Sequence, residues 1–101
     1  MNKDIRIYGP MRIAIDDIIY SGANGIVPNE YGGITVIKEG NAWCVALTRN
    51  EYKYQECVPP GRNQIHRLHA AAYEMYVRHK ARMEREGNEK RLVRRNHQQT
   101  N

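Results

Sequence analysis

The sequence predicts an α+β domain, in which a small antiparallel sheet packs on one long C-terminal helix with a basic tail. Two observations predict this fold class. Between Gly33 and Val58, apolar and polar residues alternate in three short runs that tight turns separate, a pattern typical of antiparallel strands. Between Asn63 and Glu86, apolar residues recur at every third or fourth position, which is typical of an amphipathic helix.

The length and composition are those of one globular domain. The chain has 101 residues, of which 41% are hydrophobic and 27% charged, so we expect a single domain over residues 1–87 and a flexible basic tail over residues 88–101. There is no Phe but there are seven Tyr, so aromatic packing must come from Trp43 and the tyrosines. No signal peptide or transmembrane run is visible, so a cytoplasmic protein without a membrane partner is expected.

The N-terminal third is predicted to contribute strands to the sheet. In Asp4–Tyr8 and Met11–Ile15, isoleucines alternate with other residues, which favours two short strands, and Gly9-Pro10 is expected to break the chain between them. Asp16–Tyr20 fits either a strand end or one helical turn. Ser21–Gly32 is dense in Gly, Asn and Pro, so it is predicted to be a loop.

The clearest sheet signal is a three-stranded meander. One face of its middle strand would carry Trp43, Val45 and Leu47, and this face is expected to pack on the helix, because a three-stranded sheet needs such cover to be stable. The strands are joined by tight turns at residues 39–41 and 49–51, and they are predicted at Gly33–Lys38, Ala42–Thr48 and Tyr52–Val58.

The long helix has predicted start and stop signals. Asn63 follows the helix-breaking residues 59–61 and can cap the first turn with its side chain, and Gly87-Asn88 is a plausible stop. The apolar residues of this helix can also be aligned with the a and d positions of a coiled coil, so a homodimer through the long helix is one arrangement that the pattern allows. The stripe that faces the sheet is predicted to contain Ile65, Leu68, Ala72, Met75, His79 and Met83.

The positive charge is concentrated in the C-terminal part of the chain. Net charge is +5; residues 1–61 hold six Lys or Arg against seven acids, whereas residues 62–101 hold ten against four. This asymmetry indicates a polyanion such as DNA or an acidic protein surface, although a helix of this kind can also simply present a solvated face. The candidates for phosphate or partner contact are Arg67, Arg78, Lys80, Arg82, Arg85, Arg91, Arg94 and Arg95.

Two sequence stretches carry a resemblance to known DNA-binding domains. GITVIKEGNAWCVAL and HRLHAAAYEMYVRH, within residues 33–82, resemble the AP2-type domain and are similar to the N-terminal arm-binding domain of tyrosine integrases. The resemblance implies that the exposed sheet face enters the major groove while the helix packs behind it. That face would hold Thr35, Ile37, Cys44, Ala46, Thr48, Lys53 and Gln55, and Arg49 would lie at a turn; Arg49, Lys53 and Gln55 are the candidates for close DNA contact.

Cysteines and histidines give no specific metal motif. Cys44 and Cys57 are expected to be free thiols in a reducing cytosol, because neither a secretory signal nor a disulfide-rich pattern is present. His66 and His69 are neighbours on a helix face, but the separation of the two cysteines does not suit a zinc finger. The histidines are therefore predicted to lie at the helix edge, and no metal site is expected.

Catalytic motifs are also lacking. Asp16-Asp17 with Glu30 is better explained by a turn or a cap than by a magnesium site, and no nucleophile is oriented by a base. The glycine-containing stretch at residues 22–25 has neither of the phosphate-binding glycine patterns. We therefore expect no catalytic residues, no cofactor and no enzymatic activity.

These observations predict a noncatalytic DNA-binding accessory or regulatory protein of the phage or mobile-element type. The alternative is a small protein-binding inhibitor or adaptor, for example a phage anti-defence protein that blocks a host nuclease complex. Tyr52 and Tyr76 are candidate aromatic anchors in either case. The two hypotheses differ in salt dependence, because phosphate binding weakens steeply as salt rises and a protein interface tolerates moderate salt.

Overall fold

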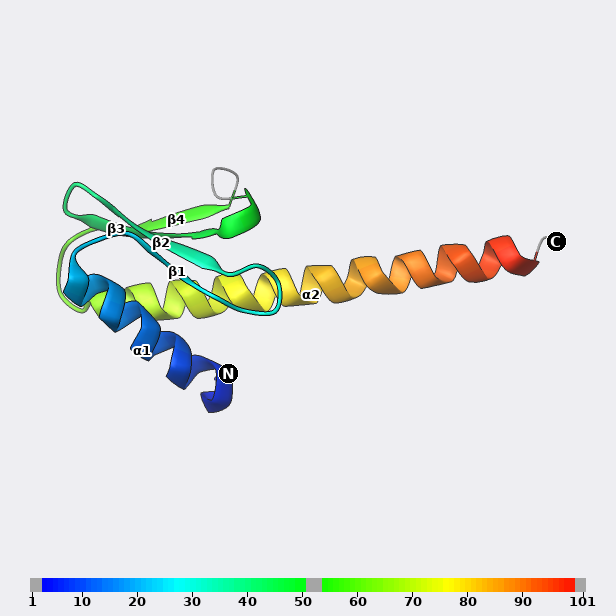
Figure 1. The fold of residues 1–101 in the computed structure, drawn as a ribbon, viewed down its shortest axis with the longest axis horizontal. Helices are drawn as coiled ribbons and strands as arrows, with labels where there is room; N and C mark the ends of the chain where they lie inside the picture. Colours follow the sequence, from blue (N-terminus) through cyan, green and yellow to red (C-terminus); the bar gives the residue numbers. More distant parts are fainter. Residues whose placement is uncertain (1–2, 51–53, 100–101) are drawn as a thin grey trace.

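The computed structural model describes the backbone of residues 3–50 and 54–99, and the side chains of residues 3–49 and 54–87. It confirms the predicted α+β class: a four-stranded antiparallel sheet has strand order β1-β2-β3-β4, and both helices pack on one of its faces (Figure 1). The elements in chain order are α1 (Ile5–Ser21), β1 (Gly25–Val27), β2 (Ile34–Glu39), β3 (Ala42–Leu47), η1 (Thr48–Asn50), β4 (Gln55–Val58) and α2 (Gln64–Gln99).

The β2–β3 hairpin lies where the sequence predicts it. Glu39 pairs with Ala42, so Gly40 and Asn41 form the turn. Gly40 has φ of 61°, a conformation that glycine adopts without the steric penalty of a side chain. The third predicted strand is confirmed in its second half as β4, while residues 51–53 lie outside the described part of the chain.

The predicted N-terminal strands are wrong, because residues 5–21 form the helix α1. Asp4 caps this helix: its carboxylate accepts hydrogen bonds from the backbone N–H and the guanidinium of Arg6. These bonds lower the pKa of Asp4, and those from the Arg6 side chain have the largest effect. Gly22 ends the helix with φ of 75° and donates to the carbonyls of Ile18 and Ile19.

The helical period of α1 explains why the prediction failed. Met11 and Ile15 are buried, and Ile7, Ala14 and Ile18 pack against the same core, so these residues follow the i, i+3, i+4 spacing of one helix face. The isoleucine-rich sequence also alternates locally, which imitates a strand. The expected break at Gly9-Pro10 does not occur, since Pro10 lies inside the helix.

The predicted loop at residues 21–32 contains a short edge strand. In β1, Val27 is buried opposite Ile34, whereas Ile26 is exposed on the other face of the sheet. β1 pairs with β2 and contacts α1. The sheet therefore gains its fourth strand from this segment and not from residues 4–15.

The core lies between the sheet and the two helices. The predicted contact of the Trp43 face with α2 is confirmed for Leu68 and Ala72, but not for Ile65, which is 44% exposed. His79 is buried as predicted. The core cluster contains Met11, Ile15, Val27, Ile34, Val36, Trp43, Val45, Leu47, Val58, Leu68, Ala72, Met75 and Tyr76.

α2 is much longer than the sheet that it supports. Its 36 residues correspond to about 54 Å at 1.5 Å per residue, and the molecule measures 59 × 28 × 19 Å. The helix therefore projects beyond the sheet toward the C-terminus (Figure 1). The predicted stop at Gly87-Asn88 is wrong: good helix formers lie on both sides of this pair, and one glycine costs only about 1 kcal/mol.

α2 begins at the predicted position, but Asn63 contributes through its backbone and not through the predicted side-chain cap. Asn63 has φ of 62°, and its backbone carbonyl accepts a hydrogen bond from the N–H of Arg67 at 2.9 Å. Asparagine tolerates this left-handed conformation better than most residues do.

The expectation of free cysteines is wrong. Cys44 and Cys57 are directly opposite each other in the β3–β4 register and form a disulfide, with their Cα atoms 4.0 Å apart. The pair is separated by 13 positions in the sequence, and only the register of the two strands brings the side chains together.

Candidate binding surfaces on α2 and the sheet

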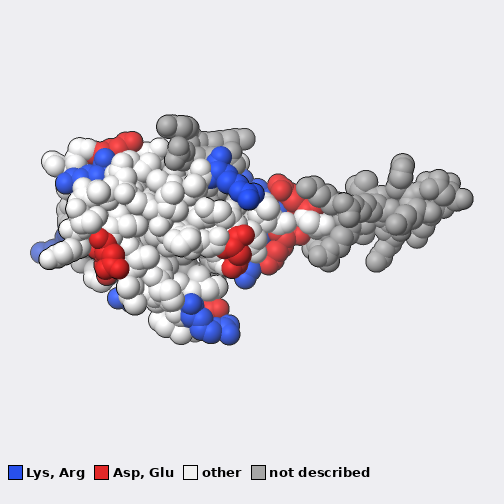
Figure 2. Space-filling model, viewed as in Figure 1, with Lys and Arg blue, Asp and Glu red and all other residues white. Residues whose placement is uncertain are grey.

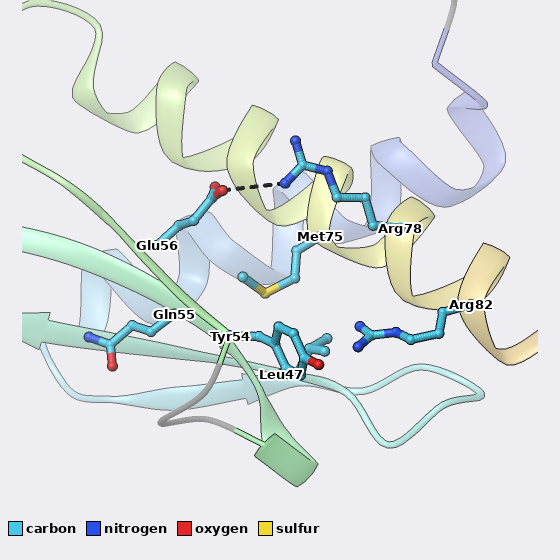
Figure 3. Close-up of a pocket in the computed structure, with 7 residues that line it drawn as sticks. All are labelled: Leu47, Tyr54, Gln55, Glu56, Met75, Arg78 and Arg82. Carbon is cyan, nitrogen blue, oxygen red and sulfur yellow. Dashed lines mark ion pairs between the residues drawn. The ribbon is translucent and has the colours of Figure 1, made fainter.

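A groove lies where α2 leaves the sheet beside β4 (Figure 3). It encloses about 250 Å³ and brings together three residues that the sequence predicts to bind a partner: Gln55, Arg78 and Arg82. Buried Leu47 and Met75 form an apolar base. The groove is lined by Leu47, Tyr54, Gln55, Glu56, Met75, Arg78 and Arg82.

The two arginines at this groove are held in different ways. Arg78 forms ion pairs with Glu56 and, one turn earlier on α2, with Glu74, each at 3.6 Å. Its side chain remains mostly exposed, so these pairs are weak surface interactions. The guanidinium of Arg82 lies 4.3 Å from the ring centre of Tyr54, which is a cation–π contact. The charge of Arg78 is thus balanced by acidic neighbours, whereas Arg82 packs on an aromatic ring.

The sheet face away from the helices has little charge. Thr35 and Thr48 share a hydrogen bond of 3.0 Å, and Gln55 donates to Glu39 at 3.4 Å and to the sulfur of Cys57 at 3.2 Å. The other predicted members of this face, Ile37, Cys44 and Ala46, are apolar, and the latter two are fully buried. Lys53 lies outside the described residues. The strand residues that the structure describes therefore place no Lys or Arg on this face.

Arg49 lies toward the helix side of the sheet. Its side chain passes next to Gly32, where its Nε would be 3.1 Å from an added Cβ. The pKa of His79 on α2 is lowered mainly by burial and then by Arg82, with a smaller contribution from Arg49. Arg49 therefore belongs with the cations near α2 and not with the outer sheet face.

The remaining predicted cations are distributed along α2. Arg67 donates to the carbonyl of Pro59 at 3.4 Å, near the start of the helix, and Arg85 is exposed. Lys80 is partly buried and contributes, after the dominant effect of Arg6, to the low pKa of Asp4. The view in Figure 2 shows a body surface that is mostly uncharged, with cations and acids at its margins.

The three arginines nearest the C-terminus, Arg91, Arg94 and Arg95, belong to the projecting part of α2. Their side chains lie beyond the described part of the chain. The backbone nevertheless shows that the residues predicted to form a tail continue the helix to Gln99.

One of the two candidate aromatic anchors, Tyr76, is buried and does not lie at the surface. Tyr76 is 3% exposed, and its hydroxyl donates to Glu30 at 2.6 Å, so it belongs to the core. Burial, followed by this bond, raises the pKa of Tyr76. Tyr52 lies outside the described residues. Tyr54 borders the groove instead; its position two residues after Tyr52 in the same alternating run was the only sequence signal for it.

Several polar residues considered as metal or catalytic groups hold the fold together. The ring of His69 is 2% exposed, not at the helix edge as predicted, and its Nε2 lies 2.7 Å from Asp16 Oδ1, which joins α2 to α1. His66 is exposed and contacts the His69 ring edge-on. Buried His79 contacts Tyr31 in the same way.

Clustered metal-ligand atoms are rare in the described part of the chain. Only Glu39, Cys44 and Cys57 place such atoms within 4.8 Å of one another, and both sulfurs of this group are joined in the disulfide. Asp16, Asp17 and Glu30 form no such group, since the first bonds to a histidine and the last to Tyr76.

Comparisons with known proteins identify no relative of this chain. Neither helix, over the residues described, is apolar enough for the length needed to cross a bilayer. Of the resemblance predicted over residues 33–82, the structure confirms only a small α+β fold, to which it adds a helix and an edge strand. The chain matches no known protein-family model, no curated protein sequence and no solved structure.

Proposed function

We propose that this chain is a noncatalytic DNA-binding accessory or regulatory protein, of the kind that phages and mobile elements carry. The observation that supports the proposal is the continuation of α2 past the sheet as one helix with a basic sequence. Between Asn88 and Gln99 the sequence has four cations, Lys90, Arg91, Arg94 and Arg95, and one acid, Glu89. A projecting basic helix is suited to contact with a polyanion.

The physical basis is phosphate neutralisation. Duplex DNA has one negative charge per ~1.7 Å of axis, and each cation that binds a phosphate releases condensed counterions. An α-helix also fits the width of the major groove. The proposal keeps the phosphate contact on α2 and leaves out the sheet face, because the described strand residues of that face include no Lys or Arg. Arg82 and Arg85 lie nearer the body and would extend the contact.

A DNA partner implies action in the cytoplasm, and the disulfide makes this part of the proposal testable. Most cytosolic thiols are kept reduced, whereas Cys44 and Cys57 are bonded in the structure. Alkylation of thiols in freshly lysed cells would measure the state of the pair. Labelling of both cysteines is expected in the cytoplasm, and a fully protected pair would indicate an oxidising compartment.

The test of DNA binding is a salt titration with a random duplex, followed by fluorescence anisotropy. We expect affinity to fall steeply with salt, and Arg91→Gln, Arg94→Gln and Arg95→Gln together to reduce the log–log slope by about three units. The matched control removes three cations of the body, with Arg6→Gln, Arg12→Gln and Lys38→Gln. Equal effects of the two triple variants, or no duplex binding at low salt, would overturn the proposal.

The groove beside β4 supports a second candidate, a protein-binding inhibitor or adaptor. Its apolar base and its Tyr54–Arg82 contact are typical of an interface anchor, and β4 is an edge strand to which a partner strand can add. The partner would be a host protein, such as a subunit of a nuclease complex. A stoichiometric complex that survives moderate salt, and that Arg82→Ala weakens more than Arg67→Ala, would favour this function.

A further inference from the structure

Three side chains of metal-binding type meet on the sheet face away from the helices. Glu39 ends β2, and Cys44 and Cys57 lie directly opposite each other on β3 and β4. A carboxylate oxygen of Glu39 and the two sulfurs lie within 4.8 Å of one another. Both sulfurs are joined in the disulfide. The state of the disulfide therefore decides whether this group can bind a cation.

The two cysteines differ in their exposure to a reductant. Cys57 is exposed, whereas Cys44 is 0% exposed, so an external thiolate attacks the sulfur of Cys57 and the sulfur of Cys44 leaves. Two small-molecule thiols thereby become one disulfide, and the chain gains two thiols in exchange. Such thiols keep most cytosolic cysteines reduced, and the reduced state of this pair in the cell rests on the cytoplasmic location proposed above.

The geometry of the reduced pair suits a tetrahedral zinc ion. Directly opposite residues of an antiparallel strand pair have Cβ atoms about 4.5–5.5 Å apart. Two thiolates bound to one zinc ion lie about 3.8 Å apart, because each Zn–S bond is about 2.3 Å long and the angle between the bonds is tetrahedral. Sulfurs that point from such Cβ atoms toward a common centre can reach this separation by rotation of their side chains.

Glu39 offers a third ligand, and Gln55 connects it to the sulfurs. The amide Nε2 of Gln55 donates to the Glu39 carboxylate at 3.4 Å and lies 3.2 Å from the sulfur of Cys57. One amide thus contacts two of the three candidate ligands, as the outer partners of metal ligands commonly do. The described strand residues place no Lys or Arg on this face, so a divalent cation would balance two thiolates and a carboxylate that no side-chain cation balances.

We propose that reduction of the disulfide creates a zinc site on this face, with Cys44, Cys57 and Glu39 as ligands and the fourth position open to water. Thiolates select Zn²⁺ over Mg²⁺ and Ca²⁺. Binding releases the two thiol protons and joins β3 to β4 again, so the ion replaces the disulfide as the link between these strands. Sequence spacing does not indicate the site, because the cysteines are 13 positions apart and only strand register brings them together.

The test is an anaerobic titration of the reduced full chain with Co²⁺, a coloured substitute for Zn²⁺. We expect one ion per chain, with thiolate-to-cobalt charge transfer and the visible bands of tetrahedral cobalt, both of which Zn²⁺ abolishes. The oxidised chain and the double variant Cys44→Ala and Cys57→Ala should show neither. Glu39→Gln should weaken binding about tenfold or more. Glu56→Gln is the matched control and should have no effect, since this acid of β4 pairs with Arg78 on α2.

A stability measurement tests whether the folded chain binds the ion. Zn²⁺ should raise the urea midpoint of the reduced chain and leave that of the oxidised chain unchanged, because folding brings the ligands together. Circular dichroism of the reduced chain and of each variant confirms the fold. No charge transfer in the reduced chain, one ion shared by two chains, unchanged affinity in Glu39→Gln, or no rise in the urea midpoint would each overturn the proposal.

Alkylation in freshly lysed cells tests the site in its natural setting. Zinc-bound thiols react slowly, so both cysteines should be labelled when the lysis buffer contains a chelator and protected when it does not. Equal labelling with and without the chelator, or protection that only a reductant removes, would count against a zinc site in the cell. The cobalt titration contains no DNA, so this proposal and the DNA-binding proposal can fail independently.

Discussion

The two halves of α2 differ in what surrounds them. The first half is packed: Leu68, Ala72 and Met75 are buried against the sheet, and His69 bonds to α1 through Asp16. The half beyond Gly87 extends past the sheet and ends far from the body (Figure 1). The difference teaches that one continuous helix can supply the core of a small domain and, beyond it, a projecting segment of basic sequence.

The sequence of each half matches its surroundings. Apolar residues recur at helical spacing as far as Met83, whereas Leu92 and Val93 are the only large apolar residues after Gly87. Four of the sixteen Lys and Arg residues follow Gly87, within a segment of fourteen residues. The helix therefore changes from a core element to a charged one without a break in its backbone.

The largest expected effect is on the packed half. Leu68 is fully buried, so Leu68→Ala should lower the free energy of unfolding by about 2–5 kcal/mol through lost burial and a cavity. Urea denaturation followed by circular dichroism measures this change. Ile65→Ala, at an exposed position of the same helix, should cost less than about 1 kcal/mol. Similar losses for the two variants would contradict the assignment of the packed face.

A smaller loss of stability is expected when the disulfide in the sheet is reduced. Reduction of Cys44–Cys57, which spans 13 positions, should lower the free energy of unfolding by about 3 kcal/mol. Urea curves with and without reductant give the value. In the double variant Cys44→Ala and Cys57→Ala, added reductant should change nothing. An unchanged wild-type curve would show that the bond contributes little to stability.

His79, near the end of the packed half of α2, should also make the stability of the fold depend on pH. Burial first, and then Arg82, lower the pKa of His79 from 6.5, so the folded state favours the neutral ring. The unfolded chain then binds more protons near and below pH 6.5, and the free energy of unfolding should fall as pH drops, by at most about 1.4 kcal/mol per pH unit. Urea curves at pH 7.5 and 5.5 measure the change.

The matched variants identify the responsible histidine. His79→Gln should flatten the dependence between these two pH values, and His66→Gln, at an exposed position, should leave it unchanged. If His79→Gln kept the full pH dependence, another group would be responsible for it.

The smallest effect is expected at the junction between the halves. Gly87 lies inside α2, and outside the helix's own backbone no described residue comes within 4 Å of a Cβ added there, so Gly87→Ala should stabilise the helix locally by about 1 kcal/mol. Helical content by circular dichroism should rise slightly without a change in urea midpoint. The same change at Gly40, where φ is 61°, should instead destabilise the hairpin. A lower helical content in Gly87→Ala would contradict a continuous helix.

The predictability of the fold depended on whether local patterns were unambiguous. The β2–β3 hairpin and the packed half of α2 combine a clear period with clear turn residues, so both are predicted correctly. In α1 the isoleucines fit both a period of two and a helical face, and tertiary packing of Met11 and Ile15 decides between them. The predicted helix end at Gly87 fails for a similar reason, because the helix-forming residues around it outweigh the effect of one glycine.

The groove beside β4 was predicted only in its composition. Arg78, Arg82 and Gln55 were named from charge and alternation, and the structure brings them to one groove. Tyr76 was named as an anchor but is buried, because burial depends on which side of α2 a residue faces, and spacing alone does not give this. The disulfide likewise depends on strand register.

The most direct test of the division between the two halves is an NMR titration of the labelled chain with a short duplex. The account predicts that amide shift changes cluster in α2 beyond Gly87 and decrease toward Arg78, while Thr35, Ala46 and Gln55 on the outer sheet face stay unchanged. Shift changes centred on those three strand residues, with the end of α2 unaffected, would contradict it and assign DNA recognition to the sheet.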